Sequence, residues 1–177
     1  MKNFTENSEI LEELFIENAG LVLCNPFLPR LFSQLELTDE HRFKDNKRAE
    51  RAVLLLHHML YENSSLPEPS LVLNKLLCGL EPGIPVDRAI DVSPQEKEAI
   101  SKMLNGMIAH WNKLGKNSVN GLIDSFLIRA GKLEQGKDTW CLKVEQKAYD
   151  VLLDSIPWSY SPIKYSWMKK PIYVRWR

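Results

Sequence analysis

The residues best suited to binding or chemistry lie near the end of the chain, from residue 156 to residue 177. This stretch holds three tryptophans, three tyrosines and five lysine or arginine residues, with no acidic residue. Aromatic rings interleaved with basic groups can stack on single-stranded nucleic acid. The same residue types anchor protein interfaces, or pack within a sheet while the charged groups face water. Trp167 falls in phase with Ile163, and Trp176 with Val174, which favours packing, but all three interpretations remain open.

If this tail binds a protein, seven of its residues are the expected contacts. They are aromatic or basic, or in one case a methionine, and such residues are enriched at interfaces. The candidate partner-binding residues are Trp158, Tyr160, Trp167, Met168, Tyr173, Arg175 and Trp176.

Other residue types with catalytic or metal-binding potential lack the necessary spacing. His57 and His58 are adjacent, so on a helix they point about 100° apart and cannot share a metal ion. Cys24, Cys78 and Cys141 are far apart and odd in number, which predicts buried apolar positions rather than a disulfide framework or zinc site. The sequence contains neither a glycine-rich phosphate loop nor a nucleophile elbow. We therefore expect no catalytic residue, no cofactor, no metal and no small-molecule substrate.

Length and charge limit the class of protein. The chain has 177 residues, 44% hydrophobic and 26% charged, which is typical of a globular protein with one domain over residues 1–177. Lysine plus arginine equals aspartate plus glutamate at 23 each, so no overall charge favours DNA or a membrane surface. No apolar run reaches the roughly 18 residues of a membrane span, and the first residues carry no signal sequence. We expect synthesis in the cytoplasm.

A short hydrophobic segment, residues 68–79, is expected at the centre of the fold. Pro69 suits a first helical turn, and Gly79 suits the left-handed position just after a helix end. Between them the apolar face is so broad that only Asn74 and Lys75 are expected to point to water. Such a short helix must be covered by neighbours on several sides.

Periodic apolar residues predict further helices around this segment. Asp45 or Asn46 is expected to cap one of them, Ser93 with Glu96 forms a capping box for the next, and Ser118 caps another. Residues 17–25 are interrupted by a glycine and are expected as an extended or broken piece buried against the core. The predicted helices cover residues 10–15, 25–35, 46–61, 93–114 and 118–131.

Alternation with period two predicts strands at 140–145, 163–167 and 172–177. Residues 148–153 fit either a strand or a helical turn. The expected fold class is α+β: mainly short amphipathic helices, over about 8–131, pack in one core with a small C-terminal antiparallel sheet, over about 138–177.

Several blocks of the sequence resemble a known family. They read in the same order as in the tape-measure proteins of phage-tail-like contractile injection systems, in the form found in Bacteroidetes-type gene clusters. The resemblance implies a non-catalytic structural protein inside or at the end of a tube that a contracting sheath drives into a target. It also implies tube, cap or baseplate proteins as partners, and possible incorporation into a particle that is later released or anchored. The blocks are residues 17–32, 51–56, 68–79, 153–158, 163–168 and 174–176.

The predicted elements do not suit a molecular ruler. A continuous helix of this length would span roughly 270 Å, at 1.5 Å per residue, whereas several short helices predict a body a few tens of ångströms across. We therefore expect the terminal module of that family, which docks at a tube end, cap or baseplate. The alternative is a small nucleic-acid-binding or regulatory protein that uses the basic aromatic tail.

Overall fold

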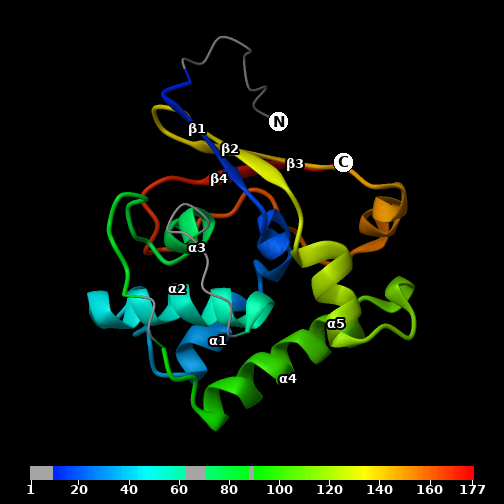
Figure 1. Cartoon of the computed structure of the whole chain (residues 1–177), viewed down its shortest axis with the longest axis horizontal. Coiled ribbons are helices and arrows are strands. Elements are labelled where there is room, and N and C mark those ends of the chain that lie inside the picture. The colour runs from blue at the N-terminus through cyan, green and yellow to red at the C-terminus, as the bar shows by residue number, and fades with distance from the viewer. Residues whose placement is uncertain (1–9, 63–70, 88–89) are drawn as a thin grey trace.

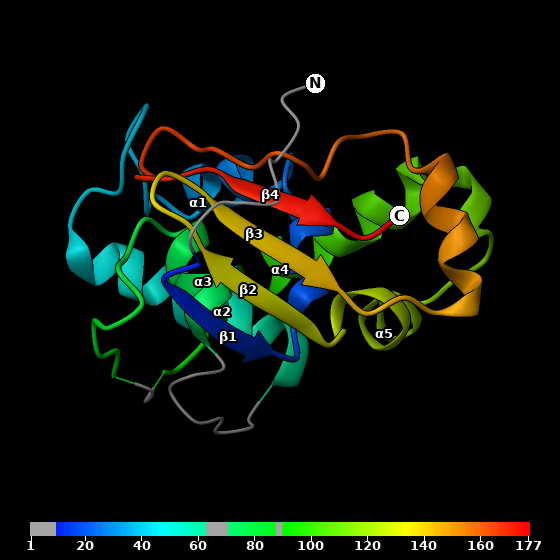
Figure 2. The ribbon, with the colours of Figure 1, turned by 90° about the horizontal axis from the view of Figure 1, so that it is seen from above.

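A four-stranded sheet lies on one side of the molecule, and the helices α1 to α5 lie on the other (Figures 1 and 2). This computed structural model describes residues 10–62, 71–87 and 90–177. The expected helix start at Pro69 lies outside these residues. The α+β class is confirmed.

The sheet differs from the predicted one in extent and direction. Its strands are β1 (Glu12–Ile16), β2 (Gly131–Gln135), β3 (Trp140–Val144) and β4 (Ile172–Arg175), in the spatial order β1-β2-β3-β4. β1 pairs antiparallel with β2, β2 antiparallel with β3, and β3 parallel with β4. The strands predicted at 140–145 and 172–177 are confirmed. The prediction of a purely antiparallel sheet confined to the C-terminal part was wrong.

β1 lies where a helix was predicted. Leu14 and Ile16 alternate toward the helices, while Phe15 between them is 76% exposed. A segment this short cannot hold a helix by itself, whereas pairing with β2 satisfies one edge of its backbone. The helical prediction for residues 10–15 was therefore wrong because a distant strand decides the conformation.

Three helix caps are confirmed. α2 (Asn46–Tyr61) begins after Asp45, whose carboxylate accepts from the Arg48 N–H at 2.8 Å. α4 (Pro94–His110) carries the complete capping box of Ser93 and Glu96, and the short helix η3 (Asn112–Leu114) follows it. α5 (Val119–Leu122) begins after Ser118, whose Oγ accepts from a backbone N–H at 3.0 Å.

Two helix boundaries were predicted wrongly. α1 (Leu28–Gln34) begins later than expected, because the Asn25 side chain does not cap it but donates to the Ser159 carbonyl at 3.0 Å. α5 continues as the π-helix η4 (Ile123–Leu127) and stops there. Gly131 therefore does not close a helix. It opens β2, where an added Cβ would lie 2.7 Å from the Ala19 Cβ.

The central helix α3 (Val72–Leu77) is buried on every side. The expectation that Asn74 and Lys75 face water was wrong, since both are fully buried. The Asn74 amide donates to the Val53 carbonyl at 3.1 Å and accepts from Asn18 at 2.7 Å. Internal partners thus replace water, which permits burial of polar groups. Gly79 has the predicted left-handed conformation, with φ at 75°.

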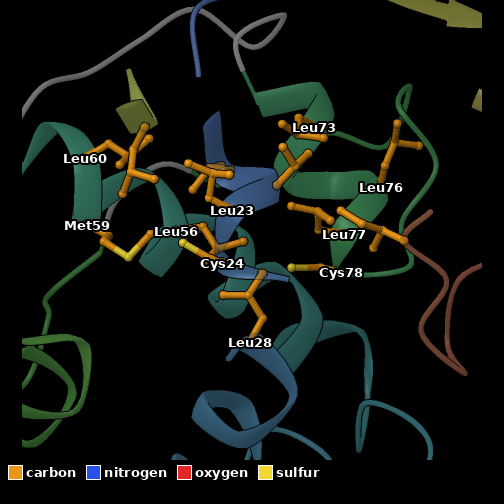
Figure 3. Packing of buried hydrophobic residues seen from close by; sticks show 14 of the residues in the cluster. Leu23, Cys24, Leu28, Leu56, Met59, Leu60, Leu73, Leu76, Leu77 and Cys78 are labelled. Carbon is orange, nitrogen blue, oxygen red and sulfur yellow. The ribbon is translucent and has the colours of Figure 1, made fainter. Parts of the chain in front are cut away.

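The core centres on the 3-10 helix η1 (Ala19–Cys24), in which every residue is buried. Figure 3 shows Leu23 and Cys24 between Leu56 of α2 and Leu77 of α3. Burial of this segment is confirmed, although it is coiled rather than extended. Gly20 is required there, because a Cβ would lie 1.8 Å from the Phe126 carbonyl oxygen.

The C-terminal part crosses back over the core between β3 and β4. It forms the 3-10 helix η5 (Ala148–Ser155), and then residues 156–171 run without regular structure. The strand predicted at 163–167 was wrong, apart from an isolated bridge between Ile163 and Ile172. Within the described ranges, no helix is long and apolar enough to cross a membrane.

Candidate functional site

The three tryptophans of the C-terminal tail bind acceptors inside the molecule. The indole N–H of Trp158 and that of Trp167 each donate to a backbone carbonyl, at 2.8 and 2.9 Å, and that of Trp176 donates to a carboxylate at 2.9 Å. A buried indole N–H needs such a partner, so these bonds fix the tail on the core. The acceptors belong to Leu23, Leu77 and Asp150 respectively.

The tryptophan rings also pack against further aromatic rings, from the tail and from earlier segments. Trp158 meets Phe27 edge-on, with ring centroids 4.8 Å apart. Trp167 lies 5.2 Å from Phe43 and 5.1 Å from Tyr165, measured between centroids. These contacts favour the packing interpretation of the tail, because rings held in this way offer less surface for stacking on nucleic acid.

Arg129 and Asp150 form a fully buried ion pair beneath the end of the chain. The guanidinium donates to both carboxylate oxygens, at 2.7 and 2.9 Å, and to the carbonyls of Ser125 and Glu145. Its Cζ also lies 5.1 Å from the centroid of the Trp176 ring, at cation–π distance. The pair therefore joins η4, η5 and Trp176, which directly follows β4.

The electrostatics of Asp150 follow from these contacts. Burial by itself would raise the pKa of the Asp150 carboxyl, but hydrogen bonds from Arg129, the Lys147 N–H and Trp176 together lower that pKa. The carboxylate is thus ionised at neutral pH and held by its donors. Its four hydrogen bonds tie Arg129, the Lys147 N–H and the Trp176 indole to η5.

The seven candidate partner-binding residues do not form one patch. Met168 and Trp176 are buried, at 5% and 1% exposure, so they contribute to the core. Trp158, Tyr160 and Trp167 are half-buried in the aromatic contacts of the tail, and Tyr173 and Arg175 lie on β4. Trp167 also borders an open groove of about 680 Å³ between α1 and residues 38–42.

Tyr173 and Arg175 share the sheet face that points away from the helices. Across the four strands, Arg175 is in register with Lys143, Lys132 and Phe15. In the adjoining row, the Glu134 carboxylate accepts from Lys132 and Lys143, both at 2.9 Å. Basic residues on this face are thus partly neutralised by the same sheet.

The opposite edge of the sheet carries exposed apolar side chains on β1 and just before it. Leu11 is 60% exposed, Phe15 is 76% exposed and Ile10 is 49% exposed. They belong to what we call the β1 edge, residues 10–16. Solvent-exposed apolar side chains gathered on one element are typical of an interaction site.

The sequence interpretation missed the β1 edge as a surface. The helix predicted over residues 10–15 placed Leu11 and Phe15 on its apolar stripe, and strand geometry instead turns them outward. The available signal was the run from Leu14 to Ile16, which combines aromatic and β-branched residues.

The three cysteines lie inside the fold. Burial raises the pKa of the Cys24 thiol to about 12, so this cysteine is a poor nucleophile at neutral pH. All three cysteines are buried and free, as expected. In the part of the chain that the structure describes, no group of three or more histidine, cysteine, aspartate or glutamate side chains could hold a metal ion.

Comparison with known families gives a match that covers nearly the whole chain. The family model described as contractile injection system tape measure protein matches residues 2–176. Comparison with curated proteins gives no match, and neither does comparison with solved structures. The match confirms the resemblance to the tape-measure family that the sequence indicated.

Proposed function

The chain belongs to the contractile injection system tape measure protein family, and on that basis we propose that it is a non-catalytic structural component of such a system. It docks as a terminal module on a protein of the tube end, cap or baseplate, and it joins the particle during assembly in the cytoplasm. The single observation that carries this proposal is the family match over residues 2–176.

The dimensions of the fold support docking rather than measuring. Among the described helices the longest is α4, which has 17 residues and therefore spans only about 25 Å. A folded chain of 177 residues has an expected radius of gyration of about 16 Å. The folded unit reaches a few tens of ångströms, so its contribution is attachment at one position along the tube.

The internal contacts of the tail support a rigid docking module. Indole N–H bonds to Leu23, Leu77 and Asp150 tie the last part of the chain to three separate elements. Rigid partners lose less conformational entropy on binding. A protein fixed in this way suits permanent incorporation in an assembly.

Location on purified particles tests the proposal. The chain is expressed with an epitope tag together with the genes of its injection system, and intact particles are purified and labelled with gold-conjugated antibody. We expect label at one end of the tube. The control is the same tag on an unrelated protein of similar size, which should stay out of the particle fraction. Absence of the tagged chain from assembled particles would contradict a structural role.

A further inference from the structure

We propose that the β1 edge accepts an extended segment of a partner protein as an added β-strand, and that this segment carries lysine or arginine between apolar residues. The identity of the partner as an injection-system protein rests on the proposed function. The chemistry of the segment rests on the residues of β1 alone.

The two edges of the sheet are treated differently by the fold. Beyond β4, the Ile163 N–H donates to the Ile172 carbonyl at 2.8 Å, and the Ile172 N–H donates back at 2.9 Å. The Val174 N–H donates to the Ser161 hydroxyl at 2.8 Å. This edge is therefore covered by the chain itself. Among the described residues, β1 pairs with β2 only, so its outer backbone groups have no strand beside them.

An uncovered edge strand is a template for β-strand addition, and folded proteins usually protect such an edge. On the β1 edge, by contrast, apolar side chains are exposed to solvent. Ile10, Leu11 and Phe15 are three of the six large apolar side chains that are exposed in the described part of the chain. Leu11 directly precedes β1 and its N–H donates to the Gln135 carbonyl, so it continues the strand pairing and lies in phase with Glu13 and Phe15. The edge thus presents an apolar–acidic–apolar row.

A second copy of the chain fits this row poorly. In an antiparallel pair of two β1 strands, the register that places Leu11 opposite Phe15 of the other copy also places Glu13 opposite its own counterpart. Like charges directly opposite each other destabilise a strand pair. The adjacent in-phase register places Glu13 opposite Phe15 and leaves Leu11 unmatched. Self-association through antiparallel β1 strands therefore either places the two Glu13 carboxylates opposite each other or leaves Leu11 without an apolar partner.

A strand with central basic residues satisfies the whole row. Opposite Phe15 and Leu11 it needs apolar side chains, and opposite Glu13 it needs lysine or arginine. On the other face of the strand, Glu12 is also exposed, so a second basic residue of the added strand fits opposite Glu12. An apolar residue of the added strand fits opposite Leu14. Read antiparallel to β1, the complementary segment is apolar, apolar, basic, basic, apolar. Glu13 already accepts from Lys132 through one carboxylate oxygen, at 3.1 Å, and a second cation adds to this pair.

The first test uses a synthetic peptide with the core Val-Leu-Lys-Lys-Val between threonines, labelled with a fluorophore, and the full chain. A strand this short gives a small interface, so we expect a Kd on the order of 100 µM. The matched peptide has both lysines replaced by glutamate and should bind at least about tenfold more weakly. Hydrogen exchange of the complex should slow at the amides of β1. Equal binding of the two peptides, no binding of the lysine peptide, or binding without added protection of β1 would overturn the proposal.

Surface variants locate the site. The double variant Leu11→Ser and Phe15→Ser should weaken binding of the lysine peptide roughly tenfold. Val151→Ser on η5, where the side chain is 57% exposed, should change it by less than about twofold. Thermal unfolding of each variant shows that the fold is retained. A double variant that is folded and binds as well as the unchanged chain would refute the assignment.

The same variants separate this inference from the proposed function. If the unchanged chain is incorporated in particles and the double variant is incorporated equally well, docking occurs elsewhere and the β1 proposal fails while the structural role stands. If the unchanged chain is absent from particles, the structural role fails, and the peptide experiment still decides the chemistry of β1.

Discussion

Replacing Asp150 by alanine is expected to destabilise the protein strongly. The carboxylate accepts four hydrogen bonds: two from the Arg129 guanidinium, one from the Lys147 N–H and one from the Trp176 indole. Asp150→Ala would leave a buried guanidinium without its counter-charge and two further donors without acceptors. Removing one partner of a buried ion pair costs about 3–5 kcal/mol, a large part of the roughly 5–15 kcal/mol that stabilises a typical domain.

Urea denaturation followed by tryptophan fluorescence measures this loss. The midpoint should fall while the slope of the free energy of unfolding against urea stays constant, because the surface exposed on unfolding is unchanged. At about 2–4 °C per kcal/mol for a chain of this size, the melting temperature should drop by roughly 6–20 °C. If Asp150→Ala does not fold, Asp150→Asn provides the measurement, since it keeps the shape and removes only the charge.

The matched control is Asp154→Ala, one turn further along the same segment. Asp154 also accepts two hydrogen bonds from an arginine, Arg177, but both side chains are in contact with water. Exposed ion pairs contribute little to stability, so this variant should unfold close to the unchanged protein. If Asp150→Ala and Asp154→Ala lost the same stability, burial would not be what makes the Arg129 pair important.

Three other expectations are open to simple measurement. Gly20→Ala should lower the free energy of unfolding by about 1–3 kcal/mol or more, because its Cβ would lie 1.8 Å from the Phe126 carbonyl oxygen. Gly106→Ala within α4 should raise the free energy of unfolding by about 0.5–1 kcal/mol, because the added methyl group meets no neighbour. Urea denaturation measures both changes. The Cys24 thiol, with its pKa raised to about 12 by burial, should resist iodoacetamide at pH 8 and react only in urea, as mass spectrometry would show; labelling of the folded protein would contradict this. Hydrogen bonds lower the pKa of Asp150 in the folded state. The stability that this carboxylate contributes is therefore present above its unfolded pKa of about 3.9 and is lost as the pH falls through its folded pKa. Below about pH 4 the free energy of unfolding should thus fall more steeply for the unchanged protein than for Asp150→Asn, and equal slopes would refute the lowered pKa of Asp150.

Local chemistry could be predicted well from the sequence. The caps at Asp45, Ser93 and Ser118 each depend on a backbone N–H three residues further along, so the necessary partners are visible in a short window. The left-handed position of Gly79 is likewise a property of one residue at a helix end.

Features that depend on distant partners could not be predicted. The residues from Ile10 to Phe15 fit a helical spacing as well as a strand, and only pairing with β2 decides between them. Burial of Asn74 depends on acceptors and donors at Val53 and Asn18, which no local pattern indicates. Composition identified the aromatic tail, but the depth of each ring follows from its contacts with remote elements.

The candidate surface shows the same division. Tyr173 and Arg175 were predicted as partner-binding residues because they lie in a stretch of unusual composition, and that remains a prediction. Leu11 and Phe15 were not considered as surface residues because apolar residues are expected inside. Whether an apolar residue of a strand faces the core depends on its phase, and a shift of one residue reverses it.

The long sequence separation between β1 and β2 affects folding during translation. Lys132 follows Glu13 by 119 residues, and at about 5–20 residues per second the first strand waits roughly 6–24 s for its neighbour to be translated. During that interval Leu11 and Phe15 are exposed on a nascent segment that lacks its partner strand. Chaperone binding to this segment would limit its aggregation. Trp158, Trp167 and Trp176 are translated later still. All three of their indole hydrogen bonds to the core can therefore be in place only after Trp176 has been synthesised.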